Sequence, residues 1–203
     1  MGITLQQFKQ MKERLGSPGT RTAAPVFNPA PIGGAGVHKV ILGLDPSLRG
    51  TGFGIIQLAK PHPLALTHGT VVCPASWPHS RCLAHIAGTI RNVLREHRPT
   101  ACVVEGLFHA QNFKTAIVMG EARGAALAVI AEAGLDIYEI APRKVKLAIV
   151  GYGAAQKSAV AKMVQRVLNL SRPPAPDAAD ALALAIAHAQ EHSRYNLSPP
   201  KKI

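Results

Sequence analysis

Acidic residues are scarce in this chain of 203 residues: 11 Asp and Glu stand against 23 Lys and Arg, a formal net charge of +12 at pH 7. This excess favours binding to a polyanion, most simply a nucleic acid, because Lys and Arg release counterions when they contact phosphates. A basic housekeeping protein without such a partner is the alternative. The scarcity also makes any carboxylate on an apolar segment informative.

Cysteines and long apolar runs are also sparse. The three cysteines (Cys73, Cys82 and Cys102) are odd in number and form no C-x-x-C pair. This excludes a disulfide framework and a zinc knuckle, and is typical of a reducing cytosol. No run reaches the ~18 apolar residues of a membrane span, and residues 1–20 lack the apolar block of a secretory signal. We therefore expect a soluble cytoplasmic protein with no membrane partner.

Hydrophobic residues make up 47% of the chain, enough for one folded domain, which we place at residues 37–190. Residues 1–36 are predicted to be a flexible basic N-terminal extension, because their second half is rich in Pro, Gly and Ala. Residues 191–203 end in Pro-Pro-Lys-Lys-Ile and are predicted to be a flexible basic C-terminal tail.

Hydrophobic periodicity predicts five strands and five helices. The expected strands are 40–44, 52–59, 64–72, 101–104 and 136–140, the first three forming an antiparallel meander. The expected helices are 81–97, 112–133, 143–150, 156–170 and 177–189. Three strands followed by alternating helices and strands predict an α/β fold, a mixed five-stranded sheet with helices on both faces.

Four carboxylates lie near the predicted ends of these elements. Asp45 and Glu105 each end a buried strand, where ligand chemistry is usually assembled. Asp177 and Asp180 are three residues apart at the start of the last helix and share a face. Alone, Asp45 could be a turn residue and Asp177 an N-cap. Together, in an acid-poor chain, they predict an oxygen-ligand site for Mg²⁺, and a pair of such ions would activate water against a phosphodiester.

A second feature is a segment with basic residues only. Residues 140–176 hold Arg143, Lys144, Lys146, Lys157, Lys162, Arg166 and Arg172 with no acid. Because a solvated helix face normally mixes signs, this run predicts a polyanion-binding surface. On the helix expected from residue 156, Lys162 and Arg166 share a face opposite three valines, so both are candidate DNA contacts.

Four segments together resemble the RuvC family of Holliday-junction resolvases: ILGLDPSLRGTGFGII, CVVEGLFHAQNFKTAIVMGEARGAA, VKLAIVGYGAAQKSAV and PDAADALALAIAH. They follow the family's order and spacing over about residues 39–190. The resemblance implies a ribonuclease H-like fold and a bacterial-type cytoplasmic endonuclease of recombination and DNA repair. It also implies a homodimer that nicks a four-way junction symmetrically, leaving 5′-phosphate and 3′-hydroxyl ends, with a branch-migration complex as a family-level partner.

The resemblance also assigns roles to individual residues. It implies that two Mg²⁺ ions per active site, with Mn²⁺ as an alternative, are held by four catalytic carboxylates: Asp45, Glu105, Asp177 and Asp180. Lys157 matches the family lysine close to the scissile phosphate, and Lys146 matches another DNA-contacting lysine. The family usually has Gly where this chain has Ser47, a departure that removes no ligand.

Three further positions carry open interpretations. Phe108 matches a family aromatic that stacks on an unpaired base near the crossover, although a lone Phe is more often a core residue, as we expect of Phe113. Gly120 and Gly124 lie four residues apart on a predicted helix, so one stripe permits close backbone approach. That stripe packs either on the sheet or, by the resemblance, at a dimer interface.

Three other functions compete with a junction resolvase. The spacing from Asp45 to Thr51-Gly52 also resembles the first phosphate loop of an actin-fold ATPase, but 203 residues are too few for the two domains of that fold. A junction-binding protein without catalysis would not need four acids. Another ribonuclease H-like nuclease, acting on RNA:DNA hybrids, is separated from the resolvase only by the resemblance.

Overall fold

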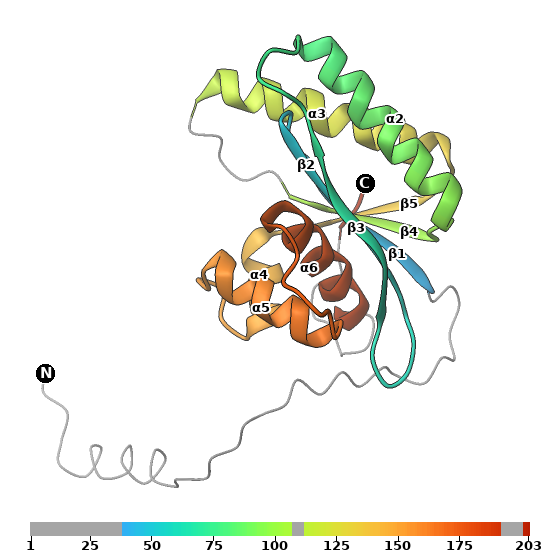
Figure 1. Cartoon of the computed structure of the whole chain (residues 1–203), viewed down its shortest axis with the longest axis vertical. Coiled ribbons are helices and arrows are strands. Elements are labelled where there is room, and N and C mark those ends of the chain that lie inside the picture. The colour runs from blue at the N-terminus through green and yellow to red at the C-terminus, as the bar shows by residue number, and fades with distance from the viewer. Residues whose placement is uncertain (1–37, 107–111, 192–200) are drawn as a thin grey trace, which may run out of the picture.

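The computed structural model describes residues 38–106, 112–191 and 201–203. Its centre is one sheet in the order β3-β2-β1-β4-β5-β6 (Figure 1). The strands are β1 (Val40–Asp45), β2 (Gly50–Gln57), β3 (Leu64–Val72), β4 (Ala101–Glu105), β5 (Asp136–Ile140) and β6 (Lys201–Lys202). The first three form the predicted antiparallel meander, while β4 lies parallel to β1 and β5 parallel to β4. The predicted mixed sheet is confirmed.

The described sheet has six strands, so the prediction of five was wrong. Lys201 and Lys202 pair antiparallel with Glu139 and Tyr138 of β5, and Lys202 Nζ lies 2.7 Å from Asp136 Oδ1. The last residues of the expected tail are therefore part of the fold. A two-residue strand of lysines has no hydrophobic period by which it could be predicted. Residues 192–200 of that tail and the whole N-terminal extension, 1–36, lie outside the described residues.

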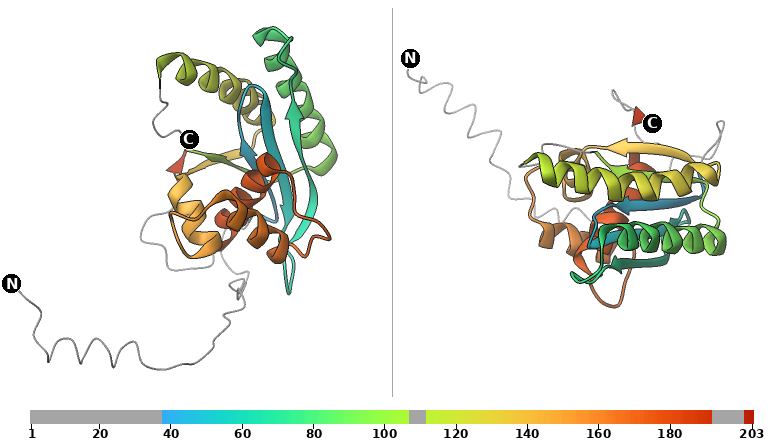
Figure 2. Two further views of the ribbon diagram at one scale, coloured as in Figure 1. Left: turned by 60° about the vertical axis from the view of Figure 1, so that its left-hand side comes forward. Right: turned by 90° about the horizontal axis from the view of Figure 1, so that it is seen from above.

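Helices cover both faces of the sheet, as predicted (Figure 1, Figure 2). One face carries α2 (His79–His97) and α3 (Phe113–Glu132), and the other carries α4 (Pro142–Val150), α5 (Lys157–Val167) and α6 (Pro176–Glu191). Strand residues alternate between the two layers, so Leu42 and Leu44 pack toward α2 and α3 and Ile41 packs toward α6. No helix in the described part of the chain has the length and hydropathy needed to cross a bilayer.

Helix α6 lies unusually close to strands β1 and β2. Gly43 and Gly54 are paired across the two strands, and both face α6. A Cβ built on Gly43 would come within 1.8 Å of the carbonyl oxygen of Ala181, and one on Gly52 within 2.1 Å of that of Asp177. Only residues without a Cβ fit here, so the glycines set the depth of α6 on the sheet.

Substitution of Gly43 by Ala should test this contact. The added methyl group meets the backbone of α6, which cannot move aside cheaply, so we expect a loss of about 1–3 kcal/mol or more in the free energy of unfolding by urea. Gly88→Ala is the matched control: it lies in helix α2 with no atom within 4 Å of its built Cβ. The control should gain roughly 0.5–1 kcal/mol. Equal stability of the two variants would contradict the tight contact.

Candidate active site

Two of the four predicted carboxylates end neighbouring parallel strands. Leu44 of β1 is in register with Val104 of β4, so the next residues, Asp45 and Glu105, lie side by side at the same edge of the sheet. Asp45 also pairs with Gly52, the glycine that contacts the backbone of Asp177. Strand alternation turns both carboxylates toward α6.

The other two carboxylates come from the first turns of α6, Asp177 and Asp180. Burial, together with the charges of Glu105, Asp180 and Asp177, raises the pKa of Asp45 to about 7, against the opposing charge of Lys157. Burial and the charge of Asp180 raise the pKa of Glu105 in the same direction. The structure therefore brings all four predicted acids into one electrostatically coupled cluster.

Basic side chains from α4 and α5 border this cluster. Lys157 Nζ donates to Asp180 Oδ2 at 2.6 Å, and this hydrogen bond is the main reason why the pKa of Lys157 is raised. Lys146 lowers the pKa of Glu105, so its charge also reaches the site. Lys162 and Arg166 are exposed farther along α5, opposite the buried valines of that helix.

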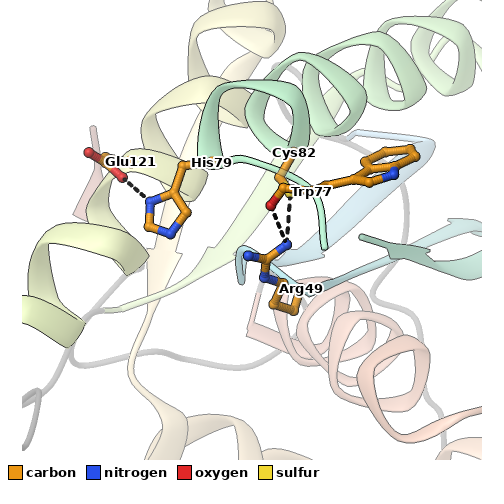
Figure 3. Close-up of polar contacts among 5 residues, drawn as sticks. All are labelled: Arg49, Trp77, His79, Cys82 and Glu121. Atoms are coloured by element: carbon orange, nitrogen blue, oxygen red, sulfur yellow. Dashed lines mark hydrogen bonds and ion pairs between the residues drawn. The ribbon is translucent and has the colours of Figure 1, made fainter. Parts of the chain in front are cut away.

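The turn after Asp45 is fixed by polar contacts. The Ser47 hydroxyl accepts from the Gly50 amide at 3.1 Å, and Thr51 Oγ1 donates to the Ser47 carbonyl at 2.6 Å. Arg49 Nη1 donates to the Pro74 carbonyl at 2.6 Å. It also donates to the Trp77 carbonyl at 3.1 Å and approaches Cys82 Sγ at 3.2 Å (Figure 3). Arg49 therefore ties this turn to the start of α2.

Helix α2 is in turn tied to α3. His79 Nδ1 lies 3.7 Å from Glu121 Oε2, as Figure 3 also shows. The contact is exposed and adds little to stability. It joins the first residue of α2 to the middle of α3.

A residue that the sequence did not single out, Arg123 of α3, supports Glu105. Its buried guanidinium donates to the Glu105 carbonyl at 2.5 Å and to Glu139 Oε2 of β5 at 2.6 Å. The pair fixes the end of β4 from the face opposite α6. Two signals were available: an arginine among small residues on α3, and a rare acid within a strand.

The cluster fits divalent cations by its chemistry. Its donors are carboxylate oxygens, which hard cations such as Mg²⁺ prefer, and bound cations would relieve the repulsion that, after burial, raises the pKa of Asp45. Among the described side chains, no three acids, histidines or cysteines already surround one metal position. Asp180 is instead hydrogen-bonded to Lys157.

The remaining predicted positions have mixed outcomes. Phe108 falls within 107–111, outside the described residues. Phe113 was expected in the core, but it is the first residue of α3 and 81% exposed, because α3 begins beyond the edge of the sheet. Built Cβ atoms on Gly120 and Gly124 have no neighbour within 4 Å, so these glycines do not pack on the sheet.

Comparison with known proteins identifies the family to which this chain belongs. A family model described as crossover junction endodeoxyribonuclease RuvC matches residues 41–188, which include all four carboxylates. The chain belongs to the RuvC family. Its relatives include the RuvC proteins of Protochlamydia amoebophila, 44% identical over 74% of this chain and 90% of the relative, and of Syntrophomonas wolfei, 43% identical over 73% and 87%.

Solved structures agree with the RuvC assignment. The structure of T. thermophilus RuvC in complex with a Holliday junction substrate has a TM-score of 0.75 and 32% identity, covering 82% of this chain and all of that one. The yeast mitochondrial Holliday junction resolvase Ydc2 has a TM-score of 0.54 at 12% identity, covers 74% of this chain and 77% of that one, and shows the shared fold alone. The expected ribonuclease H-like architecture is confirmed.

The raised pKa of Asp45 predicts how stability depends on pH without metal. In the unfolded chain Asp45 ionises near its ordinary value of 3.8, whereas in the folded protein its pKa is about 7. The contribution of Asp45 to the free energy of unfolding is therefore fully present below pH 4 and is lost as the pH rises through 7. In EDTA, urea unfolding should show a larger fall from pH 5 to pH 8 for the parent than for Asp45→Asn.

Asp136→Asn is the control for that measurement. Its exposed carboxylate has a pKa lowered by the hydrogen bond from Lys202, so the control should keep the parent's fall between pH 5 and pH 8. If Asp45→Asn lost as much stability as the parent over this range, Asp45 would not be the group that titrates.

Proposed function

We propose that this RuvC-family protein is a crossover junction endonuclease that resolves four-way DNA junctions by paired symmetric nicks. The observation that carries the proposal is the cluster of four carboxylates at one sheet edge, bordered by Lys157 and Lys146. Such a cluster beside basic helices suits a DNA backbone: the Lys and Arg side chains would hold the phosphates, and hydrolysis would take place at the carboxylates.

Asp45, Glu105, Asp177 and Asp180 would hold the divalent cations of the reaction, two Mg²⁺ per site, with Mn²⁺ suited to the same oxygen donors. When bound, these ions supply Lewis acidity and a water of lowered pKa. Water adds to phosphorus as the bond to O3′ breaks, which leaves 5′-phosphate and 3′-hydroxyl ends. Lys157, whose ammonium already reaches Asp180, is positioned to donate to the scissile phosphate.

The DNA would run along α4 and α5 beside the carboxylates. Lys146, Lys157, Lys162 and Arg166 provide a basic surface there, and Phe108 remains a proposed stacking residue. Residues 1–36 stay a predicted basic extension of the domain at 37–190. A branch-migration complex as a partner rests on the family alone.

A second copy of the chain would cover α3. Phe113 and Ile117 are 81% and 48% exposed, and they continue the stripe of Gly120 and Gly124 at helical spacing. Since these glycines do not pack on the sheet, their open stripe supports the family's homodimer. Two active sites in one dimer would account for paired nicks in strands of like polarity.

Cleavage of three DNA substrates tests the proposed activity. With Mg²⁺, the protein should nick a synthetic four-way junction symmetrically and leave a matched linear duplex and an RNA:DNA hybrid intact. Asp180→Asn removes one charge from the cluster, so cleavage should fall by about 10²–10³-fold or more. Junction affinity, measured by a mobility-shift assay, should stay within a few fold.

The control variant is Asp136→Asn, an exposed acid that pairs with Lys202 on another part of the sheet. Its cleavage rate should match the parent's. Preferential cutting of the hybrid would favour the competing ribonuclease function, and undiminished cleavage by Asp180→Asn would contradict its place in the metal site.

A charge on the open stripe of α3 tests the dimer. Ile117→Glu buries a carboxylate if the stripe is an interface, so sedimentation at micromolar concentration should give the monomer mass, and nicks should become unpaired. Leu64→Glu alters a side chain of similar exposure, 54%, on strand β3 and should leave the mass unchanged. An unchanged mass for Ile117→Glu would place the interface elsewhere.

A further inference from the structure

A hollow of about 730 Å³ lies beside the proposed active site, between the outer side of α4 and the loop that leads to α5. Its lining includes Arg143, Lys146 and Leu147 of α4 and Tyr152 and Gly153 of the loop. Helix α4 starts directly after β5, whose last residue Ile140 is in register with Glu105. The hollow is therefore adjacent to the carboxylates but separate from them.

Two backbone hydrogen bonds fix the loop that lines this hollow. Helix α4 ends at Gly151, which has a positive φ of 80° and donates to the Leu147 carbonyl at 2.9 Å. The next turn is closed by the Ala155 amide, which donates to the Tyr152 carbonyl at 3.1 Å. A short connection fixed at both ends presents Tyr152 without requiring a rearrangement on binding.

The lining is positively charged at one side. Among the described residues, no salt bridge joins Arg143 or Lys146 to a carboxylate. A Cβ on Gly153 would lie 2.8 Å from Arg143 Cγ, so the arginine stem runs against this glycine and its direction depends on it. Two cations and no acid in the lining select an anion.

The other side of the hollow is apolar and aromatic. Tyr152 is 65% exposed and Leu147 is 56% exposed, and they are the exposed large hydrophobic residues of α4, α5 and the loop between them. A flat ring beside two cations matches a nucleotide, with the base on the ring and the phosphate on the cations. The volume suits one nucleotide and is too small for a duplex.

We propose that this hollow binds one unpaired nucleotide of the DNA strand that passes the active site. Its base stacks on Tyr152, and its phosphate contacts Arg143 and Lys146. The proposal rests on the proposed function, because it requires a junction strand that passes the carboxylates and has one nucleotide out of its pair there. It adds a second stacking position to that function, on the α4 side of the carboxylates.

The test couples Tyr152 to a single base. Junctions in which each nucleotide near the exchange point is replaced in turn by an abasic residue are titrated with Asp180→Asn protein, which should bind without cutting. At one position the abasic junction should bind about tenfold more weakly, the size of one lost base–aromatic stack. In Tyr152→Ala the same abasic change should have no effect, and Tyr152→Phe should behave as the parent.

A further variant and its control separate the contribution of the base from that of the phosphate. Arg143→Ala should weaken binding of every junction and lower the salt dependence by about one phosphate contact, while the abasic effect persists. Arg91→Ala is the control, since Arg91 lies on α2 and pairs with Glu132. It should change neither quantity.

Three results would overturn the proposal: no abasic position that acts through Tyr152, an effect of equal size in Tyr152→Ala, or micromolar binding of free thymidine 5′-monophosphate that Tyr152→Ala removes. The last result would identify a free-nucleotide site. Each can occur in a protein that still nicks the junction symmetrically, so failure of this proposal is distinguishable from failure of the proposed function.

Discussion

The contact between the backbone of α6 and the glycines of β1 and β2 determines how close the acids of α6 lie to those of the sheet. A helix normally stands off a sheet by the length of its side chains, but Gly43, Gly52 and Gly54 remove that layer. The alanines of α6 remove it from the other side, since Ala181 and Ala185 face the same strands. The first turns of α6 therefore reach the end of β1, and no loop intervenes between the acids of the helix and those of the sheet.

This closeness has an electrostatic cost: burial, and after it the repulsion between neighbouring carboxylates, raises the pKa values of Asp45 and Glu105. Side chains free to move would separate under such repulsion. Here the backbone holds them, because α6 is fixed by the glycine contact and β4 by the buried Arg123 on the opposite face. A cluster held against its own repulsion is pre-organised for cations, since little reorganisation is needed when they bind. The stability of the fold thus supports a site that is locally unfavourable without its ions.

The elements, and the meeting of the four acids at one edge, could be predicted because both have strong local signals: hydrophobic period for the strands and helices, and isolated acids at their ends. The sequence could not predict the depth of α6, since the use of Gly43 and Gly54 depends on a pairing between strands. Arg123 was missed for the same reason, because its partners, Glu105 and Glu139, come from two other elements. Phe113 was misplaced because the helical pattern does not reveal where α3 leaves the sheet.

The distribution of acids also explains why the positive charge of the protein is prominent on α4 and α5. Outside the site, five acids on α2, α3 or β5 lie beside a basic side chain: Glu132, Asp136 and Glu139 pair with Arg91, Lys202 and Arg123, and Glu96 and Glu121 lie beside histidines. On α5, Lys157 pairs with Asp180 of the site itself. These five acids are thus confined to α2, α3 and β5, while the basic residues of α4 and α5 lie next to the negative cluster of the site. A phosphate backbone lying on α4 and α5 would neutralise their positive charge, and would bring its own negative charge to the edge where the carboxylates meet.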